Sequence, residues 1–424
     1  MRSLQKIMGS ETNLTGYRVS TVAHCFLWVL LVIEVTKKVL IPALVSEGPF
    51  GIWHVNGTYL FCDFPSIFNF TKAFWLEHRS QGVSVYSVAN HLKVTSDWAG
   101  QEYKHSLSFG YSPTMLLVLS PLVYFSHAMA FCIFNSAGLL AIWWQTRPIR
   151  SRLGIGILAF LSPLSMACFQ QGQTALLTGT GLLFLFERSR NGFERIISWQ
   201  TSLAGLVLWS LTAKPPLALT AVAVLLGLRQ WRPVLFAALL VLITTLTISP
   251  FLGPGWITDY VHLITTHNRV QADPAFAFSH FPQHMANLRG VLSIDVNLPD
   301  DIASWISSTV WLIVLALLVA GGPLLRLTVG GFWSVGILFY LLFCPHVSSF
   351  EVLQVVLLIP FCIPAQSKKL DWKELVLLFM VPLLPYASPV QLDNRIFLFS
   401  GMMFLLGFIF VNWRKSSGNC AGVP

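Results

Sequence analysis

Residues 302–321 read IASWISSTVWLIVLALLVAG and contain no charged residue. An α-helix of this length reaches about 30 Å, which is the thickness of the hydrocarbon core of a bilayer. Similar uncharged apolar stretches recur elsewhere in the chain, for example at residues 127–145 and 234–248. The pattern predicts a helix that crosses a membrane, repeated several times.

The composition of the 424-residue chain agrees with this interpretation. Hydrophobic residues make up 54% and charged residues only 11%, and the mean hydropathy is +0.66. A soluble domain is about 25% charged. The net charge of +9 is scattered over short loops, as membrane orientation requires, so we do not expect a nucleic-acid partner. We predict an integral membrane protein of the all-α class, surrounded by lipids.

The chain is predicted to form a single polytopic domain over residues 1–424, with about twelve transmembrane helices and both termini in the cytoplasm. The first extracytoplasmic loop is expected at residues 39–126 and a second large one at residues 251–301. The expected spans are approximately 21–36, 127–145, 154–170, 174–186, 197–212, 217–228, 234–248, 302–321, 327–344, 350–363, 375–386 and 395–411.

Two interpretations compete for the apolar residues 112–125: a span, or a helix that lies along the membrane surface. The loops at 147–152 and 187–195 each carry three arginines and should therefore be cytoplasmic. A span at 112–125 would place the first of these loops outside, whereas a surface helix leaves both on the favoured side. About 14 residues is also short for a span. We therefore predict a surface helix.

With this threading, the polar clusters that are able to carry chemistry reach one side of the membrane, the extracytoplasmic side. These clusters are Asp63, Gln171-Gly172-Gln173, Lys214-Pro215-Pro216, His346, Glu351 and Asp393-Asn394-Arg395. The segregation predicts an active site on that side.

Asp63 stands between Phe61-Cys62 and Phe64-Pro65 in the first outer loop. A carboxylate among aromatic residues near the bilayer is costly unless it is paired or used, and it can act as a general base on a hydroxyl. Asp before Pro is equally typical of a helix N-cap. The spacing alone leaves both interpretations open.

Two further clusters carry polar groups suited to a sugar phosphate. The amides of Gln171 and Gln173 flank Gly172 and are able to bind sugar hydroxyls, although a polar turn between two spans has the same sequence. Lys214 closes an apolar hairpin. Its ammonium is a candidate for binding phosphate, and the alternative is a lysine that extends to the membrane interface.

The second large outer loop and the turn after residue 344 add basic and acidic candidates. Arg269 and Arg289 are able to clamp a phosphate, and His346 is able to donate a hydrogen bond to it, although a capping or solvated histidine is an equal alternative. Glu351 follows on the same outer turn. The histidines of the loop lack the spacing of a zinc site such as HExxH, so we expect no metal.

The order of these motifs resembles the polytopic GT-C glycosyltransferases that use polyprenyl-phosphate sugars. The likeness is to the family of polyprenol-phosphate-mannose-dependent α-1,2-mannosyltransferases and mycobacterial arabinofuranosyltransferases, and it covers about residues 55–365. The matching motifs are Asp63-Phe64, Gly82 to Tyr86, Tyr111-Ser112-Pro113, Pro121-Leu122, Gly172-Gln173, Lys214-Pro215, Arg229-Gln230-Trp231-Arg232 and Pro345-His346. The family usually has Tyr-Pro-Pro, whereas Ser112 stands in the middle here.

The resemblance implies a GT-C-type helical bundle in a plasma membrane, which we expect to be bacterial, with surface helices in the first outer loop. It also implies Asp63 as the catalytic base of an inverting transfer without a cofactor. The donor would be a polyprenyl-monophosphate sugar, either mannose or another hexose or pentose, and the acceptor an extracytoplasmic glycan or glycolipid. The candidates for the donor phosphate are Lys214, Arg269, Arg289 and His346. The candidates for the sugar or the acceptor are Gln171, Gln173, Tyr111 and Glu351.

The alternative function is a membrane transporter or lipid flippase, because twelve spans and an intramembrane lysine would suit either. Transporters usually place their sites near the midplane and consist of repeated halves. Here the polar clusters gather at one face and the two halves do not match, so the sequence favours the enzyme. A noncatalytic membrane scaffold is the third possibility.

Overall fold

The computed structural model describes residues 21–45, 54–55, 58–59, 63–77, 84–99, 110–147, 155–193, 198–266, 285–322, 325, 327–347, 349–358, 372–384 and 395–412. The secondary structure of this part of the chain is helical except for a small antiparallel pairing of β1 (His54–Val55) with β2 (Thr58–Tyr59), and turns connect the helices. The all-α class predicted from the sequence is confirmed.

Residues 21–45 are one helical segment, which ends in η1 (Thr36–Leu40) and α2 (Ile41–Val45). The first half of the chain continues with α3 (Asp63–Lys72), η2 (Ala73–Glu77), α4 (Val88–Ala99), α5 (Pro113–Val118), η3 (Ser120–Tyr124), α6 (His127–Thr146), α7 (Ile155–Phe160), α8 (Pro163–Gln171), α9 (Ala175–Ser189) and α10 (Trp199–Leu211). The second half contains α11 (Pro215–Gly227), α12 (Arg232–Ile248), η5 (Ser249–Phe251), α13 (Trp256–Thr266), α14 (Leu288–Gly290), η8 (Val291–Asp295), α15 (Asp300–Gly321), α16 (Val329–Phe343), η9 (Ser349–Leu357), α18 (Trp372–Leu383) and α19 (Arg395–Asn412).

Four helical segments are long and apolar enough to cross a membrane: His127–Thr146, Arg232–Phe251, Asp300–Gly321 and Arg395–Asn412. They correspond to four of the expected spans. The helices α11 and α16 are apolar but shorter, and a bilayer needs about 20 helical residues. The total of twelve spans therefore stays a prediction.

Two of the expected spans have an internal structure that the hydropathy pattern does not reveal. The stretch 154–170 divides at Pro163 into α7 and α8, and the hydroxyl of Ser162 accepts a hydrogen bond from the backbone N–H of Ser165 at the start of α8. The stretch 350–363 begins as the 3₁₀-helix η9. Proline ends a helix because it lacks a backbone donor and its ring clashes with the preceding turn.

The apolar stretch 112–125 consists of α5 followed by the 3₁₀-helix η3, and Pro121 stands near the start of η3. The six residues of α5 extend about 9 Å and the five residues of η3 about 10 Å, so the two together extend about 19 Å at most. The segment is thus shorter than the hydrocarbon core. This agrees with a surface helix, although its place relative to a membrane stays a prediction.

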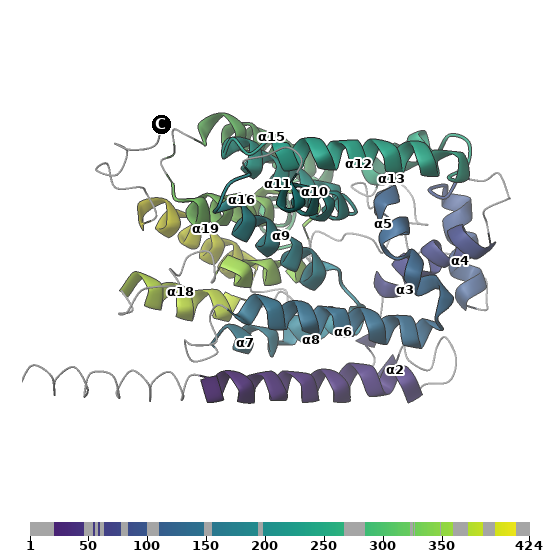
Figure 1. The fold of residues 1–424 in the computed structure, drawn as a ribbon, viewed down its shortest axis with the longest axis horizontal. Coiled ribbons are helices and arrows are strands. Elements are labelled where there is room, and N and C mark those ends of the chain that lie inside the picture. The colour runs from purple at the N-terminus through teal and green to yellow at the C-terminus, as the bar shows by residue number, and fades with distance from the viewer. Residues whose placement is uncertain are drawn as a thin grey trace, which may run out of the picture.

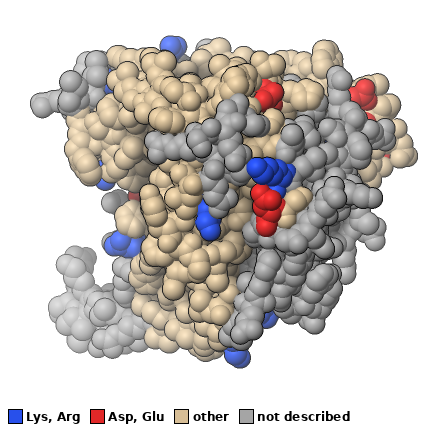
Figure 2. All heavy atoms as spheres, turned by 90° about the vertical axis from the view of Figure 1, so that its right-hand side faces the viewer, with Lys and Arg blue, Asp and Glu red and all other residues tan. Residues whose placement is uncertain are grey.

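The long helices 21–45, α6 and α12 run roughly parallel, and α3, α4, α5 and α13 gather at one end of the bundle (Figure 1). We call this end the loop end. Backbone contacts join its segments: the N–H of Val85 donates to the carbonyl of Leu252 at 3.0 Å, and the N–H of Ser112 donates to the carbonyl of Ala213 at 3.3 Å. The described surface of the loop end is mostly uncharged, with a few basic and acidic side chains (Figure 2).

The opposite end of the bundle is held together by the carboxyl end of α9. The carbonyl of Ser189 accepts a hydrogen bond from the amide of Gln230 at 2.7 Å, and its hydroxyl accepts one from the indole of Trp333 at 2.8 Å. The guanidinium of Arg232 donates to the carbonyl of Phe193. Arg232, together with the basic residues 188, 190 and 229 that neighbour Ser189 and Gln230 in the sequence, thus lies away from the loop end. The side of the membrane on which they lie stays a prediction.

Candidate functional site

The turn Gln171-Gly172-Gln173 connects α8 to α9 at the loop end. Gly172 ends α8 in the left-handed conformation, with φ 64° and ψ 44°. A Cβ added at Gly172 would overlap the Cβ of Phe64. Glycine is therefore required twice, for its backbone conformation and for the close approach of α3.

The start of α3 is fixed against this turn. Asp63 is the first residue of α3, and the next residue, Phe64, is fully buried. The ring of Phe64 lies 5.2 Å from that of Phe131 and 5.5 Å from that of His127, both on α6. Because Phe64 also packs on Gly172, the helix start that carries Asp63 lies beside the turn of the two glutamines.

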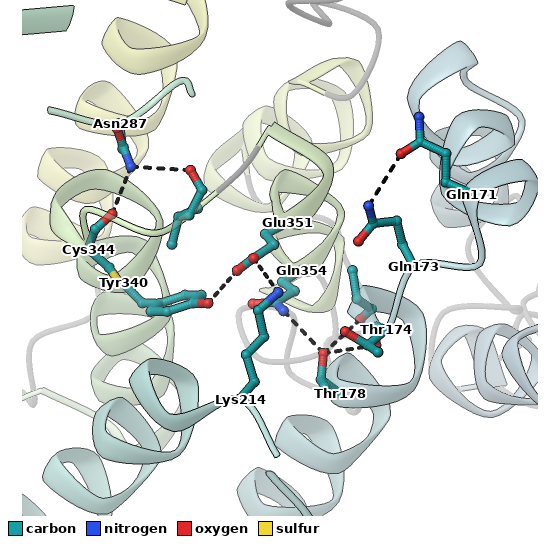
Figure 3. A network of polar contacts seen from close by, with 12 residues as sticks. Gln171, Gln173, Thr174, Thr178, Lys214, Asn287, Tyr340, Cys344, Glu351 and Gln354 are labelled. Atoms are coloured by element: carbon teal, nitrogen blue, oxygen red, sulfur yellow. Dashed lines mark hydrogen bonds and ion pairs between the residues drawn. The ribbon is translucent and has the colours of Figure 1, made fainter. Parts of the chain in front are cut away.

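Lys214 lies just before α11, which begins with Pro215 and Pro216. Its ammonium donates to one carboxylate oxygen of Glu351, and the hydroxyl of Tyr340 donates to the other (Figure 3). The side chain of Glu351 is 2% exposed and that of Lys214 is 18% exposed. Lys214 is therefore an ion-paired residue at the edge of the core, and α11, α16 and η9 meet at this group.

Polar side chains continue from Glu351 toward the glutamine turn (Figure 3). Gln354 follows Glu351 on η9, and its amide nitrogen donates to the hydroxyl of Thr178 at 3.3 Å. Thr178 lies on the first turn of α9, directly after the segment in which the amide of Gln173 donates to that of Gln171 at 3.3 Å. We call the set Lys214, Glu351, Gln354, Thr178 and Gln173 the polar strip.

The segment that contains Tyr111 is tied to the turn before Lys214. The hydroxyl of Ser112 donates to the carbonyl of Thr212 at 2.6 Å, and the carbonyl of Tyr111 accepts from the hydroxyl of Tyr86 at 3.1 Å. Ser112 stands where the resembling family usually has proline. A proline has neither a hydroxyl nor a backbone N–H, so serine provides two bonds to residues 212–213 that proline is unable to make.

Arg289 lies beneath the turn that contains Pro345 and His346. Its guanidinium is fully buried and donates to both carboxylate oxygens of Asp300, at 2.8 and 2.5 Å, and to the carbonyl of Pro345 at 3.3 Å. The amide of Asn287 donates to the carbonyl of Cys344 at 2.7 Å. Residues 287–289 thus hold the turn between α16 and η9 in place.

The charge of His346 follows from these surroundings. Burial, together with the nearby positive charge of Arg289, lowers the pKa of His346 to about 4. The imidazole is therefore neutral at pH 7, where it is able to donate a hydrogen bond but does not provide a positive charge.

Comparison with protein families shows that residues 109–345 match the model of glycosyltransferase family 87. The match covers more than half of the chain. The chain belongs to glycosyltransferase family 87. It is therefore a glycosyltransferase, and its apolar helices indicate that it is a membrane protein. Searches of curated proteins and of solved structures gave no match.

In this family 87 member, the structure brings together most of the residues selected from the sequence. Lys214 and Glu351 bind each other, Gln171 and Gln173 form the neighbouring turn, and Tyr111 borders the segment before Lys214. Arg289 is turned toward Asp300 and supports the turn at residues 344–347. Arg269 lies outside the described residues.

Several residues of the site carry no sequence signal. Tyr340 lies within an apolar helix and Gln354 within an apolar 3₁₀ segment, so hydropathy classes both as parts of spans. Asp300 was expected in the outer loop, but nothing in its spacing indicated Arg289 as its partner. Glu351 is the exception, since an acid in an apolar stretch is itself a signal.

Proposed function

We propose that this glycosyltransferase moves a sugar from a polyprenyl-monophosphate donor to the hydroxyl of an extracytoplasmic glycan or glycolipid, with inversion at the anomeric carbon. Asp63 is the general base. The sugar is mannose or another hexose or pentose. The observation that carries the proposal is the packing of Phe64 on Gly172, because it fixes the chain at Asp63 next to the glutamine turn and at the same end of the bundle as Lys214.

A lipid-linked donor suits the position of the site. The polar strip lies among apolar helices, four of which have the length and composition of membrane spans. A polyprenyl chain can remain in the bilayer while its phosphate reaches Lys214 at the loop end. Membership of a glycosyltransferase family favours an enzyme over a transporter or a flippase.

The proposed reaction needs one base and fixed positive charge. Asp63 accepts the proton of the acceptor hydroxyl as its oxygen attacks the anomeric carbon, and the bond from that carbon to the phosphate oxygen breaks. The lipid phosphate gains negative charge as it leaves, and the ammonium of Lys214 stabilises it. Glu351 and Tyr340 hold that ammonium in position before the donor binds.

In this proposal Arg289 does not contact the phosphate. Its guanidinium is buried and bound to Asp300, so it is a positioning residue for the turn that carries His346. The neutral imidazole of His346 donates a hydrogen bond to the phosphate. Gln171 and Gln173 bind sugar hydroxyls through their amides.

The donor class is testable with the purified protein in lipid nanodiscs. The protein is given radiolabelled mannose as polyprenyl-phosphate mannose or as a nucleotide sugar, in parallel with other polyprenyl-phosphate hexoses and pentoses, together with a lipid extract as acceptor. The proposal expects transfer only from a lipid-phosphate donor. Transfer from the nucleotide sugar alone contradicts it.

A further inference from the structure

The helix η9 presents two polar side chains in line. It is a 3₁₀-helix of nine residues, Ser349–Leu357, whereas most 3₁₀-helices end after three or four residues. Side chains three residues apart are eclipsed in a 3₁₀-helix. Glu351 and Gln354 therefore lie one above the other, facing Lys214 and Thr178 respectively.

Two polar atoms of this region have no hydrogen-bond partner among the described residues. They are the amide oxygen of Gln354 and the hydroxyl of Thr174. Gln354 is 1% exposed and Thr174 is 3% exposed. More than nine in ten buried polar groups are paired, and an unpaired one costs about 1–3 kcal/mol. Two unpaired groups close together are therefore unusual.

The two residues that carry these atoms both form a hydrogen bond with the hydroxyl of Thr178. The hydroxyl of Thr178 donates to the carbonyl of Thr174 at 3.1 Å, one helical turn before it, and Gln354 bonds to the same hydroxyl. Exchanging the nitrogen and oxygen of the Gln354 amide leaves the count unchanged, since Thr178 then donates to the oxygen and the nitrogen is unpaired. One atom of the Gln354 amide therefore lacks a hydrogen-bond partner in either orientation of the amide.

We propose that Gln354 and Thr174 form a subsite that recognises a hydroxyl of the transferred sugar. This inference rests on the proposed function, because it places the sugar between Lys214 at one end of the polar strip and Gln173 at the other. A sugar hydroxyl both donates and accepts hydrogen bonds. One such hydroxyl is able to donate to the amide oxygen of Gln354 and to accept from the hydroxyl of Thr174.

Both atoms are shielded from solvent, so a sugar reaches them only when the side chains that cover them move. The contacts at 3.3 Å from Gln354 to Thr178 and from Gln173 to Gln171 are long, and each is readily exchanged for a contact to a ligand. A polar pocket of this kind rejects an analogue that lacks the hydroxyl, because its own groups then remain unpaired.

The test uses the polyprenyl-phosphate sugar that the wild-type protein accepts and its set of monodeoxy analogues. The wild type should use one of these analogues about 10- to 100-fold less efficiently than the parent donor, measured as kcat/KM. In Gln354→Leu and in Thr174→Val this one difference should shrink to about threefold or less, while the penalties for the other deoxy positions stay as they were.

Gln145→Leu is the matched control. Gln145 is also buried, and its amide also donates to a threonine of α9, Thr180 at 3.0 Å, but this contact lies outside the polar strip. The Gln145→Leu variant should lose about as much thermal stability as Gln354→Leu, and its discrimination between the parent donor and the deoxy analogues should be unchanged. If the leucine variant does not fold, Gln354→Met removes the amide with a side chain of similar length, and the same loss of discrimination is expected.

The outcomes separate this inference from the proposed function. If the wild type transfers sugar and Gln354→Leu keeps every deoxy penalty, as Gln145→Leu does, the subsite is wrong and its polar groups bind only ordered water. If the wild type transfers from no polyprenyl-phosphate donor, the proposed function fails and the subsite fails with it.

Discussion

Removing Asp300 should destabilise the protein more than removing its partner Arg289. The side chain of Arg289 is 0% exposed and that of Asp300 is 27% exposed. Asp300→Asn leaves a fully buried guanidinium without its carboxylate, and the loss of one partner of a buried ion pair costs about 3–5 kcal/mol.

The converse change leaves a group that water is able to reach. After Arg289→Met the carboxylate of Asp300 keeps its bond from the hydroxyl of Ser293 at 2.9 Å, and it stands in the first turn of α15, where the helix dipole favours a negative charge. The exposed carboxylate regains hydrogen bonds to water, so the net loss in the free energy of unfolding is comparable to one charged hydrogen bond, about 1.5–3 kcal/mol. The double variant should cost less than the sum of the two single changes, because the two residues share one interaction.

The free energy of unfolding of the three variants, measured in mixed micelles by tryptophan fluorescence, checks this order. Binding of a polyprenyl-phosphate donor is measured beside it. An equal or greater cost for Arg289→Met refutes the reasoning from burial. If Arg289→Met keeps full stability and loses donor binding, Arg289 contacts the phosphate, and its role as a positioning residue is wrong.

Three further predictions concern the charge and the topology of the site. Lys214→Ala should weaken donor binding and turnover together, and Lys214→Arg should restore them only in part, because a planar guanidinium does not replace a point charge; equal binding of labelled donor to Lys214→Ala contradicts the phosphate role. Cysteines placed singly at Gly110 and His127, in a background without reactive cysteines, should both react with an impermeant thiol reagent from outside, and labelling of the second from the cytoplasm alone would show that residues 112–125 cross the bilayer. The pKa of His346 in the folded protein, about 4, is below its ordinary value of 6.5, so its stabilising effect is complete above pH 6.5 and is lost as the pH falls toward 4. His346→Asn should therefore reduce the loss of thermal stability between pH 7 and pH 5, and an unchanged pH dependence argues against a neutral imidazole in the folded protein.

Much of the fold was predictable because it depends on hydropathy. The uncharged stretches 127–145 and 302–321 correspond closely to α6 and α15. The break at Pro163 and the 3₁₀ form of η9 were not predicted. They arise from proline and from tertiary packing, and a hydropathy average records neither.

The candidate site was predictable where a polar residue interrupts an apolar stretch. Lys214 and Glu351 are conspicuous for this reason, but their pairing joins residues that are 137 positions apart and depends on how α11 packs against α16 and η9. Arg289 illustrates the limit of such reasoning. The sequence shows a cation in an outer loop, and only the three-dimensional arrangement shows that Asp300 binds it.

The role of Asp63 as general base is the centre of the proposed mechanism. The most direct measurement compares wild type with Asp63→Asn, purified in nanodiscs, for sugar transfer from a radiolabelled polyprenyl-phosphate donor and for binding of the same donor. The amide keeps the size of the side chain but is unable to accept the proton of the acceptor, and the loss of a general base costs on the order of a hundredfold or more. We expect transfer to fall by at least that factor while donor binding and expression stay close to wild type. Turnover of Asp63→Asn near the wild-type rate would contradict the mechanism and leave Asp63 with only a structural role at the start of α3.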